Sequence, residues 1–245
     1  MMNTNLLRKR IVEKGMEMGF GHYCSAMSCV DVCAFLYENI LSDDDIFIMS
    51  KGHGIIAVLP ILEKQGKDVK WKPYLDFDPK NGIEATTGSL GHGLPIALGR
   101  AFAKKKTGQG RVFCMVGDGE IQEGSNWEAM SIASHLKLNN LFILVDWNKY
   151  QAVSSVESIH GLNLEKLTRR MEAFGCTVSS TDGHTEEGLE KLSSILTLPS
   201  DGPKAVILDT IKGKGIPYLE KNPSFHVIYW HEHPEEYRET LEVLS

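Results

Sequence analysis

RVFCMVGDGE at residues 111–120 and NNLFILVDWNK at residues 139–149 are the most informative stretches of this sequence. Both contain a run of apolar and β-branched residues, which predicts buried strands over residues 111–116 and 140–147. The segment between them predicts a helix over residues 125–138. A strand, a helix and a second strand of these lengths form a βαβ crossover, so we expect the two strands to lie parallel in one sheet.

The alternation of apolar runs and amphipathic segments continues on both sides of this unit. We expect helices over residues 5–18, 28–40, 52–65, 94–106, 164–174 and 186–196. We expect further strands over residues 46–49, 177–180 and 204–210, and a polar loop over residues 67–83. These elements predict an α/β fold, an open, mainly parallel sheet with helices on both faces. We expect a single domain over residues 1–245, with an extended C-terminal tail from about residue 212.

Composition and charge argue against several classes of protein. The net charge is −6, so no excess of positive charge attracts nucleic acid or an anionic membrane. No apolar run approaches the ~20 residues of a membrane-spanning helix. The five cysteines include no Cys-x-x-Cys pair, so we expect reduced, mostly buried thiols instead of a zinc site. The first residues lack the apolar segment of a secretory signal, and we expect a cytoplasmic protein.

Polar residues follow both strands of the crossover, GDGE at residues 117–120 and DWNK at residues 146–149. In a parallel sheet the carboxyl ends of strands meet at one edge, where ligands bind. The Asp118 carboxylate and the Asn148 amide oxygen suit a hard divalent cation, and the glycines let the main chain approach a phosphate. GDGE alone is typical of a surface turn. Together with Asn148 it favours a diphosphate held through Mg²⁺, and no dinucleotide-binding or P-loop glycine motif competes.

This combination resembles the thiamine-diphosphate motif, a Gly-Asp-Gly followed after the next strand by Asn. More narrowly, the whole chain resembles the N-terminal, diphosphate-binding half of transketolase. The stretches that carry the resemblance stand in family order: GHYCSAMSCVDV at 21–32, MSKGHG at 49–54, EATTGSLGHGLPIALG at 84–99, GDGEIQEGSNWEA at 117–129, HLKLNNLFILVDWNK at 135–149 and TIKGKG at 210–215. The resemblance implies transfer of a two-carbon ketol group from a ketose donor to an aldose acceptor.

The resemblance also implies a metal site and a set of cofactor contacts. Asp118, Asn148 and the main-chain carbonyl of Tyr150 match the ligands of Mg²⁺, whose place Ca²⁺ or Mn²⁺ can take. Gly91 matches a main-chain contact to the aminopyrimidine of thiamine diphosphate. The positions that match cofactor contacts are His53, Leu90, Gly91, Gly117, Asp118, Gly119, Glu120, Glu123, Asp146, Asn148, Tyr150 and Lys212.

Three histidines are expected to be catalytic on the same grounds. His53 matches a histidine near the diphosphate, His22 one near the reacting carbons of the donor sugar, and His226 one near the donor's oxygen atoms. Three acidic residues match positions at the subunit contact that links paired active sites: Glu123, Glu128 and Asp146.

Two departures from the family pattern lead to expectations about a partner subunit and about the substrate. The pyrimidine-binding and C-terminal domains of transketolase, including the glutamate that activates the aminopyrimidine, have no counterpart here. We therefore expect a separately encoded C-terminal transketolase subunit, which forms a heterotetramer of two chains of each kind. Residues 76–82, DFDPKNG, replace a Gly-His-Pro segment whose histidine touches the donor's hydroxyls, which points to a modified or nucleotide-linked sugar substrate.

Two alternatives to a transketolase subunit remain at the level of the sequence. The α-type subunit of a 2-oxo acid decarboxylating dehydrogenase shares the Gly-Asp-Gly and Asn element, although KGHG at 51–54 and TGSLG at 87–91 favour transketolase. A noncatalytic subunit that keeps the cofactor fold for assembly or regulation is the second alternative. The presence of Asp118, Asn148 and His53 argues against it.

Overall fold

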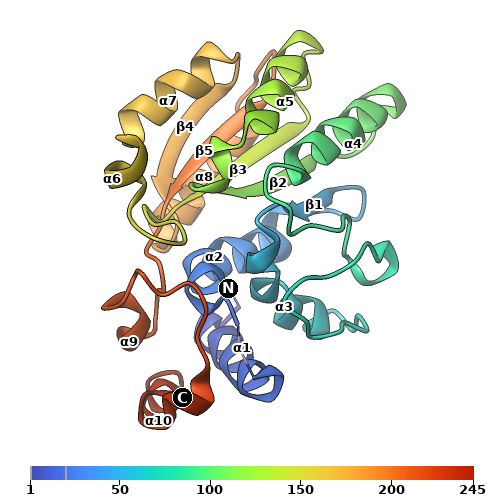
Figure 1. Cartoon of the computed structure of the whole chain (residues 1–245). Coiled ribbons are helices and arrows are strands. Elements are labelled where there is room, and N and C mark those ends of the chain that lie inside the picture. Colours follow the sequence, from blue (N-terminus) through green and yellow to red (C-terminus); the bar gives the residue numbers. More distant parts are fainter. Residues whose placement is uncertain (1, 20) are drawn as a thin grey trace.

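The computed structural model describes residues 2–19 and 21–245, and these form an open sheet of five parallel strands (Figure 1). The strand order is β1-β2-β3-β5-β4. The strands are β1 Ile46–Met49, β2 Val112–Gly117, β3 Leu141–Trp147, β4 Thr177–Asp182 and β5 Lys204–Asp209. Every neighbouring pair is parallel, which confirms the predicted crossover and the predicted sheet.

Helices cover both faces of the sheet, and each face has its own apolar core. Phe113 and Met115 of β2 pack with α1, α2, α3 and α8, whereas Val112, Cys114 and Val116 of β2 pack with α4, α5 and α7. This alternation is the two-residue period of a strand that is buried on both faces. The helices are α1 Thr4–Met18, α2 Tyr23–Phe35, α3 Leu59–Lys64, α4 Gly93–Thr107, α5 Gly124–His135, α6 Val156–His160, α7 Leu164–Ala173, α8 Glu186–Thr197, α9 Pro217–Glu220 and α10 Pro234–Val243.

Two predicted helices have different bounds in the structure. α2 begins at Tyr23, upstream of the predicted start, and is followed by a π-helix over Leu36–Ile40. All residues of α2 are buried, so it has no polar face whose spacing would mark its start. The helix predicted over residues 52–65 is a 3₁₀ helix, Gly52–Ala57, followed by α3. Pro60 lies in the first turn of α3, where its missing N–H costs no helical hydrogen bond.

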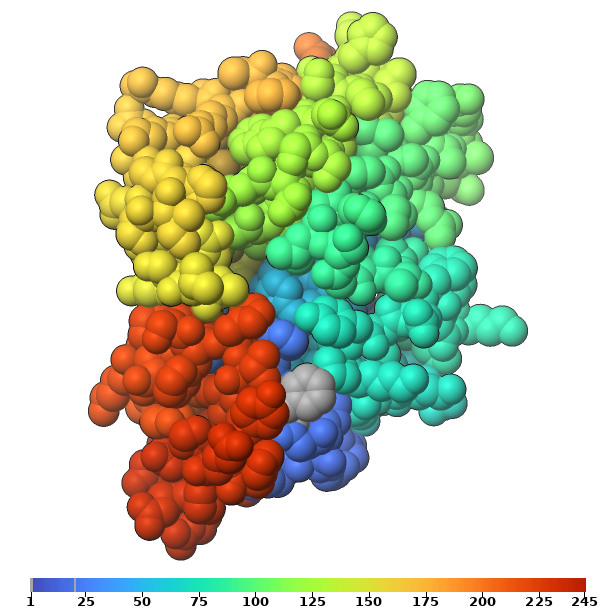
Figure 2. Space-filling view, in the orientation of Figure 1, coloured from blue at the N-terminus to red at the C-terminus, as the bar shows by residue number. Residues whose placement is uncertain are grey.

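The segment from residue 212 onward is folded, not extended as predicted. It contains α9, a 3₁₀ helix over Trp230–Glu232 and α10, and the last two contact α1. Trp230 is buried, with its ring centroid 5.5 Å from that of Tyr23. In the space-filling view this red segment packs beside the blue N-terminal helices (Figure 2). Tyr237, Leu241 and Leu244 stand at i, i+4 and i+7 and pack against the core, so the sequence carries a helical period here that the prediction of an extended tail overlooked.

Two further expectations concern the class of protein. All five cysteines are buried and free of disulfides, as the sequence predicts. Within the described residues, no helix has the length and apolar character needed to cross a membrane.

Candidate active site

A cavity of about 320 Å³ lies at the carboxyl ends of β2 and β3. Gly117 and Asp146 are paired in the parallel register, so the residues that follow them reach the same edge of the sheet. Asp118 and Asn148 both line the cavity. The two side chains that the sequence predicts to converge therefore face one shared space, from positions thirty residues apart.

The Asp118 carboxylate is held by the main chain instead of by a basic side chain. It accepts hydrogen bonds from the N–H groups of Gly119, at 2.7 Å, and Lys149, at 2.5 Å. The residue is 2% exposed, and burial together with the nearby Asp146 carboxylate raises the pKa of Asp118 to about 7. The buried carboxylate thus lacks a compensating cation among the hydrogen-bond partners in the described part of the chain.

Asn148 and Tyr150 are positioned by the turn after β3. Lys149 has a φ of 73°, a left-handed conformation in which its N–H reaches Asp118. The N–H of Tyr150 donates to the Asn148 amide oxygen at 3.1 Å, and the Asn148 amide nitrogen donates to Asp146 at 3.1 Å. Asn148 and Tyr150 both line the cavity, next to Asp118. The chain thus brings a carboxylate, an amide and a main-chain segment to one place.

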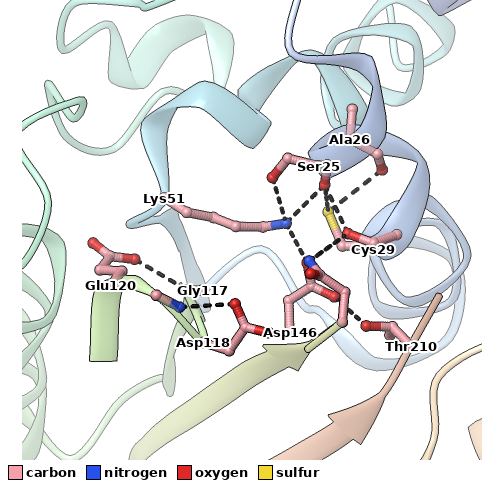
Figure 3. Close-up of polar contacts among 12 residues, drawn as sticks. Ser25, Ala26, Cys29, Lys51, Gly117, Asp118, Glu120, Asp146 and Thr210 are labelled. Carbon is pink, nitrogen blue, oxygen red and sulfur yellow. Dashed lines mark hydrogen bonds and ion pairs between the residues drawn. The ribbon is translucent and has the colours of Figure 1, made fainter. Parts of the chain in front are cut away.

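Beneath these residues lies a buried ion pair between Lys51 and Asp146 (Figure 3). The Lys51 ammonium donates to Asp146 at 2.5 Å and to the carbonyl and hydroxyl oxygens of Ser25 at 2.7 and 3.1 Å. Asp146 also accepts from Ser28, Thr210 and Asn148. Burial would raise the pKa of Asp146, but the Lys51 charge holds it below its usual value. Each N–H group of the Lys51 ammonium therefore has a hydrogen-bond acceptor, as a buried charge requires.

This arrangement corrects the expectation for Asp146. The residue is 0% exposed and does not line the cavity, so it is not at a surface where a second subunit could touch it. Its role is to anchor Lys51 and to orient the Asn148 amide. The other two residues predicted at a subunit contact, Glu123 and Glu128, are exposed, and Glu123 lies at the edge of the cavity.

Glu120 lines the cavity and joins three segments of the chain. Its carboxylate accepts from the Ser50 hydroxyl at 2.7 Å, the Gly91 N–H at 3.0 Å and the Gly117 N–H at 3.1 Å. The Gly91 carbonyl in turn accepts from the Ser125 hydroxyl at 2.7 Å. Both polar groups of Gly91 are used within the chain, and Gly91 does not line the cavity, unlike its neighbour Leu90. The expected contact of Gly91 with the aminopyrimidine therefore stays a prediction.

Gly91 should tolerate no side chain. Its φ is 82°, and an added Cβ would lie 2.6 Å from the Ser125 hydroxyl and 2.7 Å from the Glu123 Cβ. We expect Gly91→Ala to lower the free energy of unfolding by about 3 kcal/mol, which combines backbone strain with overpacking. Urea unfolding followed by circular dichroism measures the change.

Gly108→Ala is the matched control for this substitution. Gly108 ends α4 with a φ of 72°, but a Cβ there would meet nothing within 4 Å. We expect a loss of about 1 kcal/mol from backbone strain alone. Equal losses in the two variants would contradict the close packing around Gly91.

The three histidines predicted to be catalytic form one cluster. The ring centroids of His22 and His226 are 4.8 Å apart, those of His22 and His53 5.5 Å, and those of His53 and His226 5.8 Å. Burial and the nearby His226 lower the pKa of His22 to about 4. Burial and Lys51 lower the pKa of His53, and burial and Lys212 lower that of His226. All three imidazoles are therefore neutral at pH 7 and can donate or accept a hydrogen bond.

Lys212 reaches the cavity from the loop after β5. Its ammonium donates to the Gln151 carbonyl at 3.2 Å, and burial lowers its pKa. The loop is held on both sides of Lys212: the Ile211 N–H donates to the His184 ring at 2.9 Å, and the Lys214 carbonyl accepts from Arg8 at 2.9 Å. Both of these side chains bind the buried Asp31 carboxylate. Lys212 is thus fixed by a charged cluster outside the cavity.

Sequence reasoning missed Lys51 and Tyr74. Lys51 lies in the quoted MSKGHG stretch, but nothing in the sequence indicates its contact with Asp146, because Lys51 follows β1 and Asp146 lies in β3, 95 residues further along the chain. Tyr74 lines the cavity from the polar loop, with its ring centroid 5.8 Å from that of His22. Residues 76–82, whose sequence departs from the family pattern, do not line this cavity.

The residues present fit a divalent cation with a diphosphate. The hydrogen bonds that the buried Asp118 carboxylate accepts in the described part of the chain come from main-chain N–H groups, and the Asn148 side chain lies in the same cavity. Within residues 2–19 and 21–245, no group of three His, Cys, Asp or Glu side chains could hold a metal. A cation here would therefore need amide and carbonyl oxygens, and phosphate oxygens are the natural remaining ligands for Mg²⁺.

The open parallel sheet with its cavity belongs to an α/β domain of the class that binds thiamine diphosphate. The chain belongs to the family described as "Transketolase, thiamine diphosphate binding domain", whose model matches residues 3–228. This membership agrees with the resemblance inferred from the motifs and favours transketolase over a 2-oxo acid dehydrogenase.

Two curated relatives are named as single subunits of larger transketolases. The apulose-4-phosphate transketolase subunit from Actinobacillus succinogenes is 37% identical over 242 residues, which cover 89% of this chain and 86% of the relative. The 6-deoxy-6-sulfo-D-fructose transketolase subunit SqwG from a Clostridium species is 31% identical, with 91% of this chain and 88% of the relative covered.

Solved transketolases share the fold. The transketolase of Campylobacter jejuni superposes with a TM-score of 0.81 at 24% identity, over 98% of this chain. This chain spans 42% of the length of that protein.

Proposed function

We propose that this chain is the diphosphate-binding subunit of a two-chain transketolase that depends on thiamine diphosphate and Mg²⁺. The observation that carries the proposal is the cavity in which Asp118 and Asn148 meet beside three neutral histidines. Bound thiamine diphosphate would supply the carbanion chemistry that moves a two-carbon ketol group from a ketose to an aldose.

Asp118, Asn148 and the Tyr150 carbonyl would hold the cation, which Ca²⁺ or Mn²⁺ could replace. The Lys212 ammonium would add positive charge beside the diphosphate, and the Arg8–Asp31–His184 cluster keeps its loop in place. A cation next to Asp118 would also stabilise the ionised carboxylate, which burial disfavours. In this proposal the cation keeps the Asp118 carboxylate ionised, and the ionised carboxylate binds the cation.

The histidine cluster would act on the oxygen atoms of the sugar. A neutral imidazole can accept a proton from a hydroxyl or donate a hydrogen bond to a carbonyl oxygen. Burial keeps His22 neutral down to about pH 4, so it keeps one nitrogen free to accept across the physiological range. The Nδ1 of His22 is buried and has no hydrogen-bond partner among the described residues, as expected of a group that awaits a ligand.

A separate partner chain would complete the active site. The two subunit relatives match this chain over most of their own length, whereas the Campylobacter transketolase is much longer. We infer that the partner carries the pyrimidine-binding and C-terminal domains, that two chains of each kind form a heterotetramer, and that the complex works in the cytoplasm. The relatives named for apulose 4-phosphate and 6-deoxy-6-sulfo-D-fructose support a modified sugar as substrate.

Reconstitution with the partner tests this proposal. We expect the chain alone to show no ketol transfer, and its complex with a chain that carries the pyrimidine-binding domain to convert a ketose phosphate and an aldose phosphate. The assay follows sugar products by mass spectrometry, with thiamine diphosphate and Mg²⁺ present. Chelation of the metal should stop the reaction. Equal activity of the isolated chain, or a complex that releases carbon dioxide from pyruvate instead, would contradict the proposal.

A further inference from the structure

Tyr74 is the one aromatic side chain that the polar loop over residues 67–83 contributes to the lining of the cavity, within the described residues. Its ring meets His22 edge-on, with 5.8 Å between the centroids and an interplanar angle of 61°. Because His22 also contacts His53 and His226, Tyr74 extends the histidine cluster by a fourth ring. The side chain is 45% exposed, so one side of the ring faces open space.

The position of the Tyr74 ring depends on Gly88. Gly88 has a φ of 136°, and a Cβ there would lie 2.9 Å from the ring. The ring therefore packs against the main chain of Gly88, which has no side chain. Leu90, two residues further on, also lines the cavity. The Tyr74 hydroxyl has no hydrogen-bond partner in the described part of the chain, so it can bind a ligand without breaking an existing bond.

The charges around the cavity show which part of a sugar fits near Tyr74. Lys51 and Lys212 are the cationic side chains among the described lining residues. Lys51 is paired with Asp146, and Lys212 lies beside Tyr150 and Gln151 on the proposed diphosphate side. The neutral histidine cluster and Tyr74 thus offer no charge for a phosphate, which binds best to Arg or Lys. They offer donors and acceptors for uncharged hydroxyls.

We propose that Tyr74 is a specificity-determining residue whose phenol hydroxyl hydrogen-bonds a hydroxyl of the ketose donor, on the carbons beyond the transferred two-carbon unit. This rests on the function proposed above. Tyr74 supplies a hydrogen bond to the donor's hydroxyls, which in the family pattern comes from a histidine and which residues 76–82 do not provide. The donor is therefore a polyhydroxylated ketose held by its hydroxyls at this end of the cavity, and replacing the phenol changes which donors react.

Two donor substrates distinguish a contact between Tyr74 and the sugar hydroxyls from a general effect of Tyr74 on the active site. The first is the ketose that the wild-type complex uses fastest among D-xylulose 5-phosphate, D-fructose 6-phosphate, sedoheptulose 7-phosphate and the two modified sugars after which the relatives are named, apulose 4-phosphate and 6-deoxy-6-sulfo-D-fructose. The second is hydroxypyruvate, which delivers the same two-carbon unit with loss of carbon dioxide but has no hydroxyl beyond it. We expect Tyr74→Phe in the complex to lower kcat/KM for the ketose about three- to tenfold, the effect of one neutral hydrogen bond. The value for hydroxypyruvate should stay unchanged.

Tyr229→Phe is the matched control, because Tyr229 has a similar exposure of 44% and does not line the cavity. The affinity of the complex for thiamine diphosphate with Mg²⁺, measured by calorimetry, should be the same in both variants and the wild type. Equal losses with both donors, a weakened cofactor affinity, or no loss with the ketose would each overturn the role of Tyr74. A wild-type complex that uses neither donor would instead refute the proposed function itself.

Discussion

Asp118→Ala is expected to abolish Mg²⁺-dependent binding of thiamine diphosphate to the complex while the fold remains. Even residues that only orient a metal ligand cost 10–100-fold in affinity when lost, so removing a direct ligand should cost roughly 100-fold or more. The fold should survive because burial raises the pKa of Asp118 to about 7, which means that its charge is not a source of stability. Calorimetric titration with cofactor and metal measures the affinity.

Asp182→Ala provides the control for Asp118→Ala. Asp182 also accepts two main-chain N–H bonds, from His184 and Thr185, but it is exposed and outside the cavity. Cofactor affinity should therefore stay within about twofold of the wild type, since no ligand of the proposed site is touched. If Asp118→Ala bound the cofactor as tightly as Asp182→Ala does, the metal site would have to lie elsewhere.

Lys51→Met is expected to lower the free energy of unfolding by about 3–5 kcal/mol, the cost of leaving a buried charge without its partner. Asp146 is 0% exposed, and its other partners, Ser28, Thr210 and Asn148, carry no charge. Without Lys51, the carboxylate must take up a proton or remain as an isolated buried anion. Stability should then increase as the pH falls, because the folded state of the variant binds that proton more readily than the unfolded state.

Lys149→Met applies the same substitution to an exposed pair. Lys149 and Asp209 have exposed fractions of 48% and 54%, and such pairs contribute about 0–1 kcal/mol. Urea unfolding at several pH values measures both variants. A Lys51→Met protein as stable as Lys149→Met, or one without the pH dependence, would show that the buried pair adds nothing to the fold.

The sheet could be predicted from the sequence because its strands are short apolar runs with clear ends. β2 and β3 are buried on both faces, so almost every residue in them is apolar, and GDGE and DWNK mark where they stop. The start of α2 could not be predicted, since a helix that is buried all round has no amphipathic period. The C-terminal segment is a different case: the spacing of Tyr237, Leu241 and Leu244 is helical, but the surface of α1 on which the segment packs is distant in the chain.

The candidate site also has features that the sequence predicts and features that it does not. Local patterns are enough to predict that a carboxylate and an amide each follow a buried strand of one βαβ crossover, because the apolar runs and the polar residues after them are contiguous in the chain. Three other contacts are visible only in the folded chain: Asp146 pairs with Lys51, Glu120 accepts from the Gly91 N–H, and Tyr74 packs against the histidine cluster. Those contacts join segments far apart in the chain, and which distant side chain fills a given space depends on packing in three dimensions, not on any periodicity of the sequence.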